Sequence, residues 1–78
     1  MNVIENIVNR VLEDYGMRAE LVETRVNRDY ISWFFDNGLT IVYSEHSNTL
    51  YVRFIKHIAE LLIKELRKHI LFRRVLYG

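Results

Sequence analysis

The clearest candidates for binding chemistry are basic side chains near the end of the sequence. KELRKHILFRR, residues 64 to 74, carries five basic side chains and one acid, although the formal net charge of the whole chain is +1. Arginine and lysine bind the phosphate oxygens of nucleic acids, and arginine does so through a planar fork. The predicted nucleic-acid-binding residues are Arg53, Lys56, Lys64, Arg67, Lys68 and Arg74. The alternative is an ordinary solvated helix face, because the helix dipole also favours basic residues near a C-terminus.

Charge is unevenly distributed along the chain. Residues 1–52 hold four arginines and eight acids, whereas residues 53–78 hold seven lysines or arginines and two acids. This asymmetry indicates either contact with a polyanion or electrostatic pairing between copies of the chain. We favour nucleic acid as the partner.

Metal and catalytic chemistry have weak support in the sequence. His57 and Glu60 lie one helical turn apart, as do Glu65 and His69, but each pair supplies only two ligands and a zinc site needs three or four. Neither an HExxH motif nor a glycine-rich phosphate loop is present. We therefore predict no catalytic residue, no metal and no cofactor, and conclude that the protein is not an enzyme. An active site assembled between two copies is the alternative left open.

An amphipathic helix is predicted at the beginning of the chain. Its apolar residues recur at three- and four-residue spacing: Ile4, Ile7, Val8, Val11, Leu12 and Tyr15. Asn2 is the predicted N-cap, with Glu5 reaching back to complete a capping box. Gly16 should end the helix in a left-handed conformation and bring Met17 against Leu12.

Strands are predicted after this helix. RAELVETRVN alternates only approximately, which indicates a strand with a bulge near its middle. DYISWFFDNGLTIVYS predicts a β-hairpin, because Asn37-Gly38 is preferred in two-residue type I′ turns. That turn would set Phe34 opposite Ile41.

In this register both faces of the sheet are apolar. The second face then needs a cover, which a helix, a second subunit or a bound partner could provide. Tyr30, Phe34 and Tyr43 could also stack unpaired bases on an open face. Core or interface packing is the alternative explanation for these aromatic residues.

A long C-terminal helix is predicted over residues 49–75. At about 100° per residue, its apolar side chains fill an arc of roughly 220°, wider than the stripe that a one-sided surface helix needs. We therefore predict a homodimer, with a monomer in which this helix is sandwiched as the alternative. The predicted interface residues are Tyr51, Phe54, Ile58, Leu61 and Leu62.

Length and composition favour a single self-associating domain, residues 1–78. A core of this size supplies only about 3–5 kcal/mol, and the chain has no cysteine for disulfides. The predicted fold class is α+β, ordered α-β-β-β-α, with a three-stranded antiparallel sheet, an N-terminal helix and a long C-terminal helix. This order is similar to that of double-stranded-RNA-binding domains. The resemblance covers topology only, and no binding residue is carried over from that family.

The sequence thus predicts a small, non-catalytic binding or regulatory protein. It would be a homodimer that contacts an acidic partner through a basic stripe on its C-terminal helix. The alternative is a protein-binding inhibitor or adaptor of the kind encoded by viruses or mobile elements, which would act through the apolar sheet face. No membrane span and no signal peptide are expected, so we predict a cytoplasmic, intracellular protein.

Overall fold

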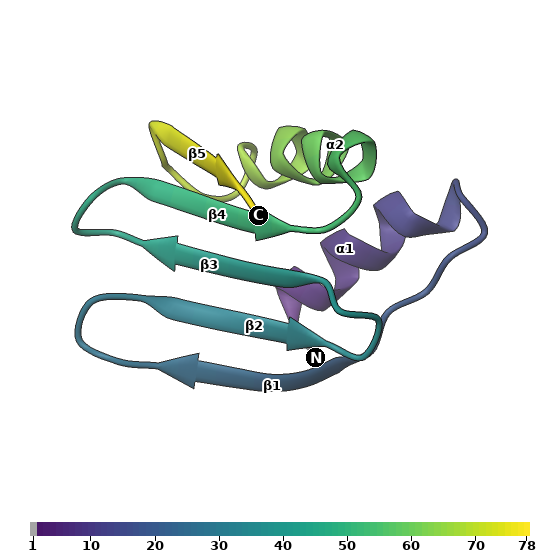
Figure 1. Ribbon diagram of the computed structural model, residues 1–78, viewed down its shortest axis with the longest axis horizontal. Coiled ribbons are helices and arrows are strands. Elements are labelled where there is room, and N and C mark those ends of the chain that lie inside the picture. Colours follow the sequence, from purple (N-terminus) through teal and green to yellow (C-terminus); the bar gives the residue numbers. More distant parts are fainter. Residues whose placement is uncertain (1) are drawn as a thin grey trace.

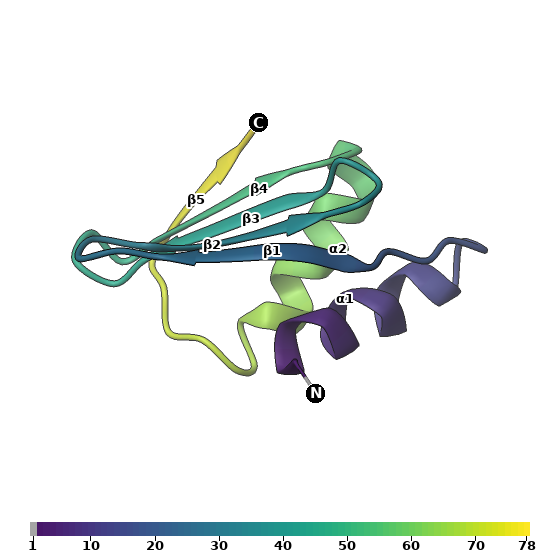
Figure 2. The same cartoon turned by 90° about the horizontal axis from the view of Figure 1, so that it is seen from below.

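Two helices pack on one face of a five-stranded sheet in the computed structural model, which describes residues 2–78 (Figures 1 and 2). The elements are α1 (Val3–Glu13), β1 (Leu21–Val26), β2 (Ile31–Phe35), β3 (Thr40–Ser44), β4 (Thr49–Arg53), α2 (Lys56–Leu66) and β5 (Arg74–Tyr77). Strands β1 to β4 form an antiparallel meander, and β5 pairs parallel with β4 after the chain crosses through α2. The predicted α+β class is confirmed. The predicted three-stranded sheet and long C-terminal helix are wrong.

The start of α1 follows the sequence prediction in part. The Asn2 side chain caps the helix, because its Oδ1 accepts from the backbone N–H of Ile4 at 2.9 Å and of Glu5 at 3.2 Å. The Glu5 carboxylate does not reach back to complete a capping box. It accepts instead from the backbone N–H of Leu21 at 2.7 Å and so ties the helix to β1.

The end of α1 follows the prediction closely. Gly16 adopts a left-handed φ of +67°. Met17 N donates to Leu12 O at 3.0 Å, and Gly16 N donates to Glu13 O at 3.1 Å. These two bonds form a Schellman motif, which satisfies carbonyls that the last helical turn leaves without partners.

The predicted bulge in β1 is confirmed, but the predicted register of the next hairpin is wrong by one residue. Leu21 pairs with Phe35 and Glu23 with Phe34, so Val22 is the extra residue of a bulge. In the β2–β3 hairpin, Phe34 pairs with Thr40 and not with Ile41.

The physical reason is the length of the turn between β2 and β3. Phe35 N donates to Leu39 O at 3.0 Å, which leaves three residues in the turn, and Gly38 takes a φ of +89°. A one-residue slip moves every side chain of one strand to the other face. Trp33, Phe35 and Ile41 therefore all lie on the helix side, where they are buried. The prediction of two apolar sheet faces is wrong as a result.

The predicted helix over residues 49–75 is divided among a strand, a shorter helix and a second strand. In β4 the burial alternates, with Leu50 and Val52 at 0% exposure and Arg53 exposed, as expected for a strand. The turn before β4 places Asn48 in a left-handed conformation with φ of +52°. The Asn48 carbonyl oxygen accepts from the backbone N–H of both Arg73 and Arg74, and so anchors the beginning of β5.

Residues predicted at a dimer interface mostly serve the core of the single chain. Ile58 and Leu62 are buried where α2 packs, and Phe54 and Leu61 are partly buried against the same core. Tyr51 lies on β4. The wide apolar arc was an artefact of winding strand residues onto a helix, so the structure removes the reason for placing an interface on these five residues.

Candidate nucleic-acid interface

The face of the sheet opposite the helices is uncovered, and we call it the open face (Figure 2). Side chains alternate along each strand, so the neighbours of the buried Trp33, Ile41 and Val52 lie on this face. Its members are Glu23 and Arg25 on β1, Ser32 and Phe34 on β2, Thr40, Val42 and Ser44 on β3, Thr49, Tyr51 and Arg53 on β4, and Arg74 and Leu76 on β5.

Aromatic and aliphatic side chains occupy the middle of the open face. Tyr51 lies opposite Val42 on one side and beside Leu76 on the other, and Leu76 is 57% exposed. Phe34 is half-buried, and the Arg25 guanidinium lies 5.3 Å from the centre of its ring. The open face therefore presents two aromatic rings next to cationic side chains.

Three arginines surround these rings. Arg25 donates from Nε to Glu23 Oε2 at 2.6 Å, and this hydrogen bond raises the pKa of Arg25 above its ordinary value. Among residues 2–78, Glu23 is the only acid on the open face, and Arg53 and Arg74 form no ion pair. The open face is therefore net positive.

Three other predicted nucleic-acid-binding residues lie elsewhere on the molecule. Lys56 begins α2, with its Nζ 5.5 Å from the centre of the Tyr77 ring. Lys64 and Lys68 lie on or just after α2, and Lys68 pairs with Glu65 at 2.9 Å. This hydrogen bond lowers the pKa of Glu65. The single basic stripe predicted on a long helix does not exist, because Arg53 and Arg74 belong to strands.

Arg67 has a structural role in the segment after α2. Its guanidinium lies 4.6 Å from the centre of the Phe72 ring, and Nη1 donates to Phe72 O at 3.4 Å. Phe72 is buried in the core, so Arg67 holds the connection that leads into β5.

Arg67→Ala is expected to destabilise the fold by about 0.5–1 kcal/mol through loss of the cation–π contact. Urea denaturation would measure this change. Lys64→Ala is the matched control, since Lys64 is exposed on the preceding turn and should leave the free energy of unfolding almost unchanged. Equal stability of the two variants would contradict the structural role of Arg67.

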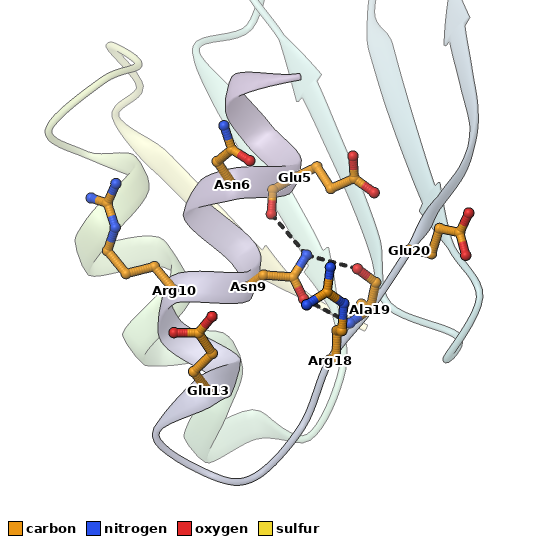
Figure 3. A pocket seen from close by; sticks show the side chains of 8 residues that line it. All are labelled: Glu5, Asn6, Asn9, Arg10, Glu13, Arg18, Ala19 and Glu20. Carbon is orange, nitrogen blue, oxygen red and sulfur yellow. Dashed lines mark hydrogen bonds between the residues drawn. The ribbon is translucent and has the colours of Figure 1, made fainter. Parts of the chain in front are cut away.

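A hollow of about 660 Å³ lies between α1 and the segment that enters β1 (Figure 3). Its central side chain, Asn9, bonds both backbone groups of Ala19. Nδ2 donates to Ala19 O at 2.7 Å and to Glu5 O at 3.0 Å, while Oδ1 accepts from Ala19 N at 2.8 Å. These bonds occupy both polar atoms of the Asn9 side chain. Asn9 therefore links α1 to the segment before β1, and we assign it a structural role and not a ligand-binding one.

The histidines do not assemble a metal site. Among residues 2–78, no three His, Asp or Glu side chains gather as possible metal ligands. His57 stands edge-on to Tyr15, with Nε2 3.4 Å from the Tyr15 hydroxyl oxygen. His69 is exposed just after α2.

Comparisons with protein-family models, curated proteins and solved structures find no match for this chain. Across residues 2–78, neither helix has the length and apolar character needed to cross a membrane. The function of the candidate interface must therefore be inferred from its geometry and chemistry alone.

The sequence analysis identified only part of this surface. It selected Arg53 and Arg74 for their charge but placed both on one long helix, whereas they lie on β4 and β5. It selected Phe34 for its ring and placed it on a strand, as the structure has it. It did not select Arg25, and it placed Tyr51 in a helix. The strict alternation in TLYVR, with β-branched and aromatic residues, was the available indication that Tyr51 and Arg53 share one face of a strand.

Proposed function

We propose that this protein is a non-catalytic, cytoplasmic binding protein that holds single-stranded nucleic acid on the open face of its sheet. The observation that carries the proposal is the combination of an uncovered sheet, two partly exposed aromatic rings and three arginines on one surface. Proteins that bind single strands without strong sequence preference combine stacking rings with cationic grooves.

The rings are the preferred contacts for bases. Phe34 and Tyr51 are both half-buried, so each is held by its neighbours while part of the ring is accessible. A duplex hides the faces of its bases in the helical stack, whereas a single strand can place them on aromatic side chains. The open face therefore favours unpaired nucleic acid over duplex.

The arginines are the preferred contacts for phosphates. Arg25 and Arg74 lie on the two outer strands, and four strand spacings separate them by about 19 Å. Arg53 lies between them on β4. A strand that crosses the sheet can thus meet cations on both sides of the rings, and binding should weaken as salt displaces these contacts.

The Arg53→Ala/Arg74→Ala double variant should weaken binding to a labelled oligothymidine and reduce the slope of log K against log salt by about 0.7 per lost contact. Tyr51→Ala should cost about 1–3 kcal/mol for a stacked base and leave that slope nearly unchanged. Fluorescence anisotropy at several salt concentrations measures both quantities. A duplex of equal length should bind more weakly than the single strand.

Lys64→Ala/Lys68→Ala is the matched control, because it removes the same charge from the helix side of the molecule. This variant should bind like the wild type. If it loses binding while Arg53→Ala/Arg74→Ala does not, the nucleic acid lies on α2 and the open face is the wrong site. If the wild-type protein retains neither DNA nor RNA at low salt, the proposed function is wrong.

A protein-binding function is favoured by a second exposed apolar region, at the end of the sheet that the helices leave uncovered. Val26 is 72% exposed, Tyr30 44% and Leu71 82%, and the Tyr43 hydroxyl donates to Leu71 O at 3.0 Å. Tyr30→Ala should abolish binding of a protein partner, and the binding of that partner to the wild-type protein should depend little on salt. Pull-down with this variant separates the protein-binding function from nucleic-acid binding.

A further inference from the structure

Strand β1 has one free edge. It is the outer strand of the sheet and pairs only with β2 (Figure 1). Val22 is 67% exposed and Val26 is 72% exposed. A six-residue edge strand with exposed valines is a template for pairing with another strand.

The backbone groups at this edge can be assigned from the hydrogen-bond pattern. Asn27 N donates to Tyr30 O at 3.0 Å at the end of the β1–β2 hairpin. In antiparallel pairs the residues alternate between those that bond their neighbour and those that point away. Arg25 therefore bonds toward β2, and the N–H and C=O groups of Thr24 and Val26 point to the free edge.

The sequence of this strand, Val22-Glu23-Thr24-Arg25-Val26, is complementary to itself in the antiparallel direction. When two copies pair with Thr24 opposite Thr24, Glu23 of each copy lies opposite Arg25 of the other. Val22 is the extra residue of the β1 bulge, so the regular ladder across the two-fold axis extends from Glu23 to Arg25 of each copy. Opposite charges and β-branched pairs both stabilise antiparallel strands.

Neighbouring registers that use the same outward-pointing groups are unfavourable. A shift by two residues in one direction sets Glu23 opposite Glu23, and the opposite shift sets Arg25 opposite Arg25. Like charges directly opposite each other destabilise a strand pair. The charges therefore select the register centred on Thr24.

We propose that two copies of this chain pair antiparallel through β1, with Thr24 on the two-fold axis, to form one continuous ten-stranded sheet. In this arrangement the helices of both copies lie on one side and the two open faces join on the other. The Glu23–Arg25 ion pair within each chain exchanges for two ion pairs between chains. The contact shares Arg25 with the proposed nucleic-acid surface, but its test is the oligomeric state of the protein alone, without nucleic acid.

Charge reversal tests the register. Arg25→Glu places a carboxylate opposite Glu23 at two positions in the dimer and should raise the dissociation constant by about tenfold or more. Glu23→Arg should do the same, because it sets two guanidinium groups opposite each other. The double variant Glu23→Arg/Arg25→Glu restores opposite charges and should dimerise like the wild type. Mixing the two single variants should also restore a dimer, because their charges complement each other.

Thr24→Pro tests the edge itself. Proline removes an N–H that points away from β2, so the fold should persist, with an unchanged circular dichroism spectrum, while the dimer is lost. If this variant does not fold, the exposed charge-reversal variants still decide the matter. Sedimentation velocity over a range of concentrations gives the mass in each case.

Thr24→Cys provides a positive test of contact, because the chain has no other cysteine. Directly opposed residues of a hydrogen-bonded pair have Cα atoms about 5.5 Å apart, a separation that a disulfide can span. Mild oxidation should give a covalent dimer for Thr24→Cys and none for Ser47→Cys, which lies in the β3–β4 turn. A wild-type protein that stays monomeric at millimolar concentration would overturn the proposal, as would a dimer that Arg25→Glu and Thr24→Pro leave intact.

Discussion

Leu62→Ala is expected to lower the free energy of unfolding by about 2–5 kcal/mol. Leu62 lies on α2 and is fully buried in the core, so its truncation removes apolar contacts and leaves a cavity inside the single chain. Denaturation followed by circular dichroism measures the loss. Because the contact is intramolecular, the loss should not depend on protein concentration.

Leu61→Ala is the matched control for this prediction. Leu61 is the neighbouring residue on α2 but is only partly buried, so the same change should cost clearly less. If Leu62→Ala does not fold, Ile58→Val should still cost about 0.5–1.5 kcal/mol, because Ile58 belongs to the same core. A stability loss that disappears as the concentration rises would show that Leu62 belongs to an interface between chains.

Asn9→Asp is expected to lower the free energy of unfolding by about 2 kcal/mol at neutral pH, since it removes two donated hydrogen bonds without changing shape. The Asn9 amide donates to the carbonyl oxygens of Glu5 and Ala19. A carboxylate at this position would face both oxygens without a proton to donate. The link between α1 and the entry to β1 would be weakened.

The pH dependence of this variant has a definite sign. The carbonyl oxygens of Glu5 and Ala19, at 3.0 and 2.7 Å, disfavour the charged form of an aspartate at position 9. They outweigh the Ala19 N–H and the guanidinium groups of Arg10 and Arg18, which line the hollow without a hydrogen bond to Asn9, so the pKa of this aspartate should be higher in the folded than in the unfolded state. The stability difference from wild type should therefore shrink as the pH falls through that raised pKa. Asn6→Asp is the control, because Asn6 is exposed on the same helix and should show little change. A pH-independent difference would contradict the role assigned to the Asn9 amide.

The N-terminal half of the fold was largely predictable because its determinants are local. Asn2 caps α1 through a side chain three residues from its partner, and Gly16 supplies the left-handed residue that ends the helix. The irregular alternation around Val22 likewise indicates its bulge. In each case the residues that decide the structure are neighbours in the sequence.

The C-terminal half was mispredicted because apolar residues in Thr49–Arg53 are compatible with two periods. Leu50 and Val52 fit the stripe of a following helix when they are wound at helical spacing, but they also alternate as in a strand. The pairing of β4 with both β3 and β5 decides between the two. The pairing with β5 joins Thr49 to Arg74, which is distant in sequence, and local periodicity does not report such a contact.

The candidate interface was predictable only in its chemistry. Arg53 and Arg74 are basic in any fold, but only the order of the strands places them on the same face of the sheet as Arg25. The error in the β2–β3 register had the larger effect, because it placed Phe34 opposite Ile41 and suggested an apolar second face. The three-residue turn that ends in Gly38 instead buries Ile41 on the helix side and places Thr40 opposite Phe34 on the open face.

The parallel pairing of β5 with β4 has a consequence for the order in which the chain folds. Each strand of the meander can pair as soon as a short turn closes, whereas β5 can dock only after α2 has formed and returned the chain to β4. Contacts between segments distant in sequence form late, because closing the intervening loop costs entropy first. We therefore expect the fifth strand to be the last to join, bringing Phe72 into the core as folding is completed.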